Sequence, residues 1–182
     1  QKVNTKPIDW TNKVFVQPKL DGVRCIFTKD GAYSRNHKQF KNVDHLQDDL
    51  QDFFKKFPDI VLDGELYNHA LKQDFEKIIS LVRKQKPSEQ DRSEASDLVQ
   101  FHVYDVITEP NFTYEFRHNM LALQLPIVKS ITLIKNTVVE SYDEAKMLHA
   151  VHLAQGYEGS MLRLNAFYEQ KRSYNLQKFK DF

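Results

Sequence analysis

The stretch Lys19-Leu20-Asp21-Gly22-Val23-Arg24 places a lysine, a carboxylate, a glycine and an arginine within six residues. Apolar residues precede it at 14–16 and follow it at 23–27, so the pattern predicts two strands that meet at this corner. A nucleophile, an acid and an anion clamp would then stand side by side. A charged surface turn built on Asp-Gly explains the same six residues equally well. The rest of the chain has to decide between these two interpretations.

The composition is that of a globular domain. The chain has 182 residues, of which 41% are hydrophobic and 28% are charged, enough for one domain with a substantial core. No apolar run approaches the ~18 residues of a transmembrane helix, and residues 1–4 lack the apolar stretch of a signal peptide. Cys25 is the only cysteine, which excludes a disulfide framework and a thiolate metal site within this sequence. These features favour a cytoplasmic protein without membrane association.

Basic and acidic residues are segregated along the chain, although the net charge is only +1. The basic residues gather in two clusters, Lys29, Arg35, Lys38 and Lys41, and Lys171, Arg172, Lys178 and Lys180. Local patches matter more than the total charge when a protein meets a polyanion. The two clusters therefore predict surfaces that face phosphates.

The hydrophobic periodicity predicts an α+β domain. Strands are expected at 14–16, 23–27, around Tyr33, and at 60–62, 98–107, 131–139, 158–164 and 176–180, with helices at 42–57, 75–82, 113–124 and 141–155. Asn42 is the expected cap of the first helix, and Gly156 is expected to end the last one. The polar stretch 84–97 predicts a mobile loop. Because there is no regular βαβ alternation, we expect antiparallel sheets in a single domain, 1–182, without an internal linker.

Two pairs of like charges stand two residues apart on predicted strands, Asp63 with Glu65 and Lys178 with Lys180. Each pair points to one face of its strand, and Gly64 allows a ligand or another backbone to approach closely. Two ammonium groups on one face favour a phosphate between them. Solvated turn acids and an edge strand protected by lysines remain the alternatives. No glycine-rich phosphate loop of the two common types occurs in the sequence.

Six segments, taken together and in this order, resemble the motifs of the covalent nucleotidyltransferases, the superfamily of ATP-dependent DNA ligases, RNA ligases and mRNA capping enzymes. The segments are KLDGVR at 19–24, SRN at 34–36, LDGELY at 62–67, VYDV at 103–106, EGSMLR at 158–163 and LQKFK at 176–180. The resemblance covers nearly the whole chain. It implies the DNA ligase/mRNA capping enzyme nucleotidyltransferase fold, in which antiparallel sheets flanked by helices surround a nucleotide groove. The fifth segment, EGSMLR, resembles that of DNA ligases, and the compact spacing of the segments resembles the small phage and viral type.

The resemblance also implies roles for individual residues. Lys19 resembles the nucleophile that takes AMP from ATP, and Arg24 and Glu65 resemble the contacts to the ribose hydroxyls. Tyr104 and Met161 resemble the contacts to the two faces of adenine, and Gln17 stands at the adenine edge, where many DNA ligases have glutamate. Lys178 and Lys180 resemble the contacts to the ATP phosphates, and Glu158 and Asp21 resemble the Mg²⁺ ligands. Arg35 and Arg172 resemble the contacts to the phosphates of a nick.

The implied function is that of an ATP-dependent DNA ligase with ATP and Mg²⁺ as cofactors. AMP would pass from Lys19 to the 5′-phosphate of a nick in duplex DNA, and the 3′-hydroxyl would then seal the nick. We expect a monomer whose complete protein carries a further OB-fold domain after residue 182. An RNA ligase, a capping-type guanylyltransferase and a non-catalytic nucleotide-binding module remain as alternatives. The presence of Lys19, Glu65 and Glu158 argues against the last of these.

Overall fold

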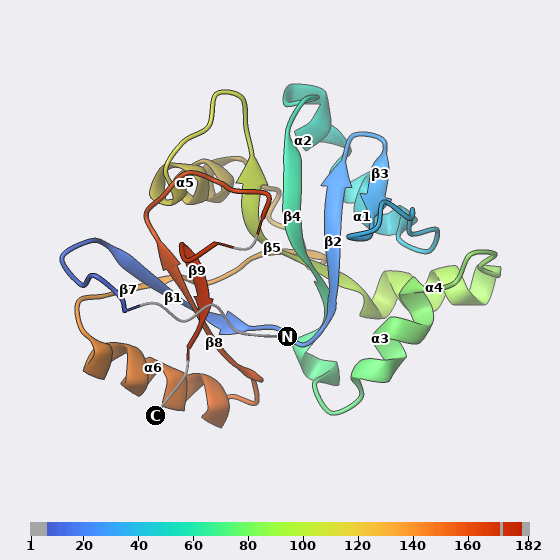
Figure 1. Ribbon diagram of the computed structural model, residues 1–182. Helices are drawn as coiled ribbons and strands as arrows, with labels where there is room; N and C mark the ends of the chain where they lie inside the picture. Colours follow the sequence, from blue (N-terminus) through green and yellow to red (C-terminus); the bar gives the residue numbers. More distant parts are fainter. Residues whose placement is uncertain (1–6, 172, 180–182) are drawn as a thin grey trace. The chain divides into compact units, whose positions relative to one another are not determined.

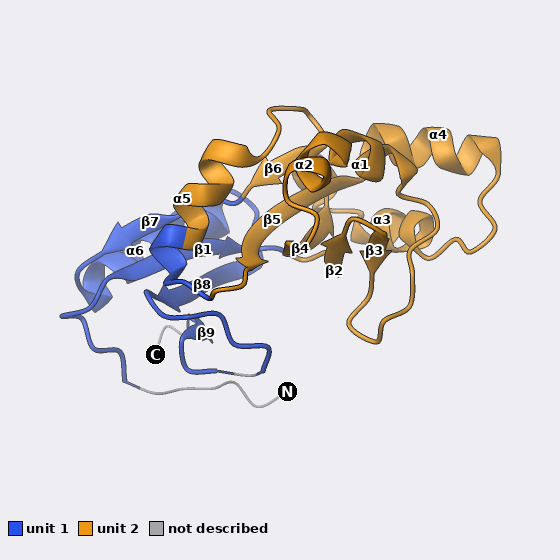
Figure 2. Cartoon of the chain, turned by 90° about the horizontal axis from the view of Figure 1, so that it is seen from above, with its two compact units in different colours: residues 1–20, 111–116, 134–182 blue, residues 21–110, 117–133 orange. Residues whose placement is uncertain are grey.

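Two β-sheets organise the chain, and each belongs to a different unit. The computed structural model describes residues 7–171 and 173–179 (Figure 1). Unit 1 comprises residues 1–20, 111–116 and 134–182, and unit 2 comprises residues 21–110 and 117–133 (Figure 2). The chain passes between the units repeatedly, so the division is not one between two consecutive domains. The stretch 19–24 contains the first of these crossings.

Unit 1 is built on a sheet of order β7-β1-β8-β9 in which all pairings are antiparallel. The strands are β1 (Val14–Lys19), β7 (Thr137–Val139), β8 (Gly159–Leu164) and β9 (Leu176–Lys178), and helix α6 (Tyr142–Ala154) packs on the sheet. Val14, Val16 and Leu162 join Ala145 of α6 in the core of this unit. Because side chains alternate along a strand, the opposite face of β1 carries Lys19 together with Gln17.

Unit 2 is built on a sheet of order β3-β2-β4-β5-β6. Its strands are β2 (Val23–Thr28), β3 (Gly31–Tyr33), β4 (Val61–Tyr67), β5 (Gln100–Ile107) and β6 (Ile131–Leu133). The helical elements are α1 (Asp44–Asp49), α2 (Gln51–Lys56), the 3₁₀ turn η1 (His69–Leu71), α3 (Phe75–Val82), α4 (Glu89–Leu98) and most of α5 (Tyr114–Gln124). Apolar side chains of the α-helices meet Phe27, Leu62 and Phe101 in one core, which leaves the alternate strand residues on the opposite face of the sheet.

The α+β class is confirmed, with one exception to the antiparallel expectation. Strand β6 runs parallel to β5, whereas the other pairings in both sheets are antiparallel. The expected strand at 131–139 is in fact two short strands, β6 and β7, which belong to different sheets. Helix α5 and the end of α6 before Gly156, whose φ is 89°, agree with the sequence pattern.

Three local expectations differ from the structure. The stretch 84–97 is not a loop, because α4 begins within it at a capping box in which Ser88 and Asp91 satisfy each other's backbone amides. Asn42 does not cap the first helix. Its buried side chain instead donates to the carbonyl oxygens of Leu81 and Asp91, 3.1 Å from each, and so ties α3 to α4. The predicted helix at 42–57 is divided at Leu50 into α1 and α2.

A backbone irregularity shapes β4 where the predicted acidic pair stands. The register between β4 and β5 shifts between Asp63 and Gly64. A Cβ on Gly64 would lie 2.3 Å from the carbonyl oxygen of His102, so glycine allows the two strands to approach here.

None of the helices in the described ranges combines the length and the apolar character needed to cross a membrane.

Candidate active site

Lys19 ends β1 and forms an ion pair with Glu158, the residue that precedes β8. The pairing of β1 with β8 sets Lys19 opposite Gly159, which brings the neighbouring carboxylate to the amine. The Lys19 side chain is 21% exposed and that of Glu158 is 46% exposed, so a ligand can reach both. An amine held as an ammonium has no lone pair, and a nucleophilic role therefore requires that Lys19 loses a proton and leaves Glu158.

Two further predicted site residues stand near Lys19 in the sheet of unit 1. Met161 of β8 lies opposite Gln17 in β1, and Lys178 of β9 lies opposite Met161. Met161 is half-buried and Lys178 is exposed. Neighbouring strands thus carry the amine, the thioether and a second cation. Lys180 and Arg172 lie outside the described residues.

Gln17 faces into the protein and is only 2% exposed. Its amide nitrogen donates to the Tyr114 hydroxyl and to Asn136 Oδ1, at 2.7 Å each, and its amide oxygen accepts from Arg163 Nε at 3.1 Å. Both amide hydrogens are therefore in use. A contact to adenine would require Gln17 to give up one of these bonds, and that role remains a prediction.

Arg24, Glu65 and Tyr104 lie on neighbouring strands of the sheet in unit 2. Asp63 holds the Arg24 guanidinium in a two-point ion pair, at 3.1 Å from Nε and 2.8 Å from Nη2. The Glu65 carboxylate accepts from the backbone amide of Gly22 at 3.1 Å and from the Tyr104 hydroxyl at 3.4 Å. The structure therefore collects an arginine, a carboxylate and an aromatic ring, the groups that a ribose and a base require.

Asp63 and His102 also lie among these residues, although no specific role was predicted for either of them. Asp63 is buried and fixes Arg24, and the signal for it was its position two residues before Glu65. His102 stands opposite Glu65 in the register of β4 and β5. Burial, together with the charge of nearby His69, lowers the pKa of His102 to about 4. The imidazole beside Glu65 is consequently neutral at physiological pH.

A buried ion pair supports the strand that carries Tyr104. Arg117 of α5 donates to Asp105 of β5 through Nε at 2.7 Å and Nη2 at 3.1 Å. Their side chains are 3% and 1% exposed, respectively. The same carboxylate accepts the backbone amide of Val106 at 2.7 Å. These bonds fix the backbone next to Tyr104.

The remaining predicted residues are exposed. Asp21 lies in the corner between β1 and β2, and Arg35 lies in the turn after β3. That turn is held by the Ser34 hydroxyl, which accepts the backbone amides of Asn36 and Lys38 at 3.3 Å and 3.2 Å. The structure thus presents the Arg35 side chain to solvent on a defined turn.

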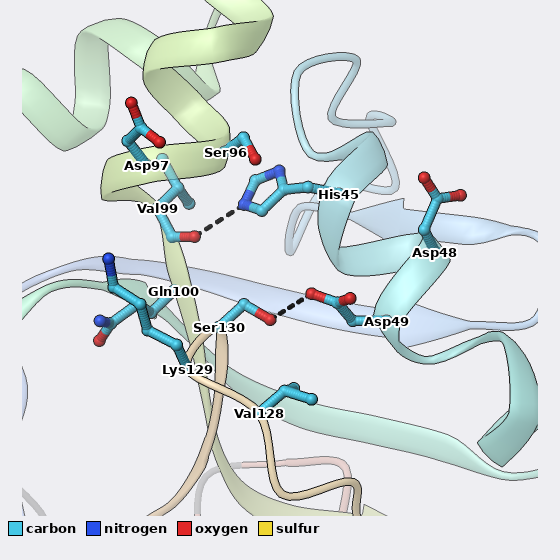
Figure 3. A pocket seen from close by; sticks show the side chains of 10 residues that line it. All are labelled: His45, Asp48, Asp49, Ser96, Asp97, Val99, Gln100, Val128, Lys129 and Ser130. Carbon is cyan, nitrogen blue, oxygen red and sulfur yellow. Dashed lines mark hydrogen bonds between the residues drawn. The ribbon is translucent and has the colours of Figure 1, made fainter.

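A cavity of about 300 Å³ lies elsewhere in unit 2, between α1, the end of α4, the start of β5 and residues 128–130 (Figure 3). In Figure 3, His45 bonds the carbonyl of Val99 at 2.8 Å, and Ser130 bonds Asp49 across the cavity. None of the predicted site residues lines it.

No group of three or more histidine, cysteine, aspartate or glutamate side chains suited to a metal occurs within 7–171 and 173–179.

We expect Gly22→Ala to destabilise the protein by about 1–3 kcal/mol, because the site leaves no room for a side chain. A Cβ on Gly22 would lie 2.3 Å from the carbonyl oxygen of Leu66 and 3.0 Å from Cγ of Glu65. Urea unfolding measures the loss. Gly159→Ala is the matched control, since its Cβ would meet its nearest neighbour, Cε1 of His149, at 3.6 Å. Equal losses in the two variants would contradict the packing argument.

Comparison with known sequences places this geometry in a family. A family model described as the ATP dependent DNA ligase domain matches residues 5–180. The DNA ligase of African swine fever virus (isolate Tick/South Africa/Pretoriuskop Pr4/1996) is 30% identical over 167 residues, covering 85% of this chain and 37% of the viral protein. The DNA ligase of Enterobacteria phage T4 is 24% identical over 214 residues, covering 92% of this chain and 44% of the phage protein. The chain thus spans less than half the length of these relatives.

Solved structures agree on the fold. A structure from a study of Lig E DNA ligases superposes with a TM-score of 0.75 at 22% identity, over 96% of this chain and 64% of that one. The ATP complex of the ATP-dependent DNA ligase from bacteriophage T7 superposes with a TM-score of 0.72 at 18% identity, over 93% and 62%. These likenesses confirm the ligase nucleotidyltransferase fold that the motifs implied. The match of the family model over residues 5–180 shows that the chain belongs to the ATP-dependent DNA ligase family.

Proposed function

We propose that this chain is the adenylation domain of an ATP-dependent DNA ligase in which Lys19 carries AMP. The observation that supports it most is the position of Lys19, which ends a strand and remains accessible beside the carboxylate of Glu158. Both residues stand in segments that resemble the family's motifs, within the range that the family model covers. We also propose that the complete protein acts as a monomer in the cytoplasm.

In the proposed first step, the Lys19 amine loses a proton and attacks the α-phosphorus of ATP. The nitrogen–phosphorus bond forms as the bond from phosphorus to the pyrophosphate oxygen breaks, and pyrophosphate leaves. Lys178, with Lys180, is proposed to offset the charge that grows on the phosphate oxygens. AMP then passes to the 5′-phosphate of a nick, and the 3′-hydroxyl displaces AMP as it seals the strand.

The residues of unit 2 are proposed to bind the nucleoside. Arg24 and Glu65 would meet the ribose hydroxyls, and Tyr104 would stack on adenine. Asp63 orients the Arg24 guanidinium through two hydrogen bonds, and Gly22 and Tyr104 orient the Glu65 carboxylate. Met161 is proposed to contact the other face of the base.

Glu158 and Asp21 are the proposed Mg²⁺ ligands. Mg²⁺ is commonly held by one or two carboxylates together with waters and substrate phosphates. Both carboxylates are exposed, which leaves them accessible to such an ion. When bound, the ion would neutralise part of the phosphate charge. Glu158, which pairs with Lys19 in this structure, would be one of the residues that hold the ion.

We expect Tyr104→Ala to weaken ATP binding by about 1–3 kcal/mol, the range of base–aromatic stacking. Tyr104→Phe should be nearly neutral, because it retains the ring that would stack, and the hydroxyl's hydrogen bond to Glu65 is long, at 3.4 Å. Isothermal titration with ATP measures both variants. If phenylalanine is as harmful as alanine, the hydroxyl rather than the ring carries the interaction.

Nicked duplex DNA is the proposed substrate, with Arg35 and Arg172 at the phosphates of the nick. We expect binding of labelled nicked DNA to weaken steeply between two salt concentrations, because phosphate contacts release counterions. Arg35→Ala should weaken DNA binding and reduce its salt dependence without changing ATP binding. Lys77→Ala is a matched control, since it removes an exposed cation of unit 2 that forms an ion pair with Glu94. Tighter binding to nicked RNA than to nicked DNA would favour the RNA ligase alternative.

A further inference from the structure

The backbone pairing of β1 changes just before Lys19. Between β1 and β7, the ladder runs from Val14 with Val139 to Val16 with Thr137. On the other side of β1, the ladder with β8 continues to Lys19. Pro18 lies between Gln17 and Lys19 and has no N–H to donate. The segment that presents Lys19 therefore extends beyond its ladder with β7.

Gln17 continues the link to β7 through its side chain. Its amide nitrogen lies 2.7 Å from Oδ1 of Asn136, the residue directly before Thr137. The same nitrogen lies 2.7 Å from the hydroxyl of Tyr114, to which Asn136 also donates at 2.9 Å. A hydrogen bond between side chains thus follows the last backbone pair, Val16 with Thr137. The Tyr114 hydroxyl accepts from both Gln17 and Asn136, so the three side chains form a closed network.

Arg163 completes the network from the β8 side. It is 7% exposed, and its Nε donates to Gln17 Oε1 at 3.1 Å. Its guanidinium lies over the ring of Tyr114, 4.8 Å from the centroid, and Phe15 meets that ring edge-on at 5.2 Å. Gln17 is therefore bonded to three other segments of unit 1. Buried polar networks whose members are satisfied fix one arrangement of the chain.

We infer that Gln17 is a positioning residue for the nucleophile, and that it acts by fixing the end of β1 rather than by contacting adenine. Gln17 and Lys19 lie on the same face of β1, about 6.6 Å apart along the strand. A shift of the strand end would be passed to Lys19 and would alter its approach to the α-phosphorus. The inference rests on the proposed function of Lys19 and specifies what holds that residue in place.

The variants Gln17→Met and Asn136→Ala test the inference in the complete protein. Methionine has a similar length but makes none of the three hydrogen bonds, and Asn136→Ala removes the bond beside β7 without changing residue 17. We expect each to lower the maximal rate of lysyl-AMP formation, per folded molecule, by about 10-fold to 100-fold. The ATP concentration at half-maximal rate and the preference for ATP over GTP should change less than about twofold, because the base is not involved.

Two further variants serve as controls. Gln17→Glu should retain more of the rate than Gln17→Met, since a carboxylate still accepts from Arg163 and can accept from a reoriented Tyr114 hydroxyl and Asn136 amide. Lys13→Ala removes an exposed ion pair with Glu115 in the same unit and should leave the rate unchanged.

A measurement without ATP separates this inference from the proposed function. Hydrogen exchange of the backbone amides of Lys19 and Leu20 should speed up in Gln17→Met and Asn136→Ala and stay unchanged in Lys13→Ala. If the wild-type protein forms no lysyl-AMP, the proposed function fails, and the exchange rates alone decide whether Gln17 fixes the strand end.

Three results would overturn the inference. The first is exchange at Lys19 and Leu20 that does not change in Gln17→Met. The second is a normal maximal rate per folded molecule, which would mean that the network affects stability alone. The third is a raised half-saturating ATP concentration with a relaxed preference for ATP over GTP, which would make Gln17 an adenine contact.

Discussion

Lys19→Arg is expected to form no covalent adduct with AMP, and Lys19→Ala should fail equally. Arginine can preserve the positive charge and an ion pair with Glu158, but its guanidinium does not deprotonate at working pH and cannot attack phosphorus. A failure of both variants would therefore be due to the missing nucleophile and not to the lost ion pair. The measurement is retention of label from α-phosphate-labelled ATP after denaturation in dodecyl sulfate at neutral pH, where a nitrogen–phosphorus bond survives.

A measurement of thermal stability provides the control for these variants. Lys19 and Glu158 are both partly exposed, and such pairs contribute little to stability, so the thermal unfolding temperature should remain close to that of the wild type. Label that stays bound to either folded variant after this denaturation would contradict the assignment of Lys19.

Arg117→Met is expected to destabilise the protein by about 3–5 kcal/mol, because it leaves the carboxylate of Asp105 buried without its partner. For a chain of this size, that loss corresponds to a fall of roughly 6–20 °C in the unfolding temperature. Combining Arg117→Met with Asp105→Asn should recover part of the stability, since neither residue of the buried pair then carries a charge. Urea and thermal unfolding measure both variants.

The matched control for this pair is Lys77→Ala, which breaks an ion pair with Glu94 on the exposed surface of the same unit. It should leave the unfolding temperature unchanged within error. A loss in Arg117→Met no larger than in this control would show that the buried pair does not hold β5 to α5.

The sequence was sufficient for the fold class and for most of the strands on which the candidate site residues stand. The reason is that the predicted residues stand in short stretches at or beside strands, where alternation identifies which side chains share a face. Lys19 and Gly22 at one strand-to-strand corner and Glu65 on β4 illustrate this. The approach of another backbone at Gly64 also followed from the residue type.

The partners of these residues could not be read from the sequence. Gln17 bonds to Tyr114, Asn136 and Arg163, which lie 97, 119 and 146 positions away. Alternation shows that Gln17 and Lys19 share a face, but not that one is covered while the other is accessible. The ion pair of Arg24 with Asp63 likewise depends on the register of β2 and β4.

Helix α4 was missed for a different reason. Its residues are mostly polar or charged, and its contribution to the core comes chiefly from Ala95, with Leu98 packed against the core at its end. Hydrophobic periodicity has little to detect in such a helix. The Ser88 to Asp91 spacing of its capping box was the signal that marked its start.

The central claim is that Lys19 accepts AMP from ATP, and peptide mapping of the nucleotide-treated protein tests it most directly. The protein is incubated with Mg²⁺ and either ATP or GTP, denatured, digested and analysed by mass spectrometry. We predict AMP attached to Lys19 after incubation with ATP, and no adduct with GTP. AMP on a different residue, a GMP adduct, or no adduct with either nucleotide would contradict the account.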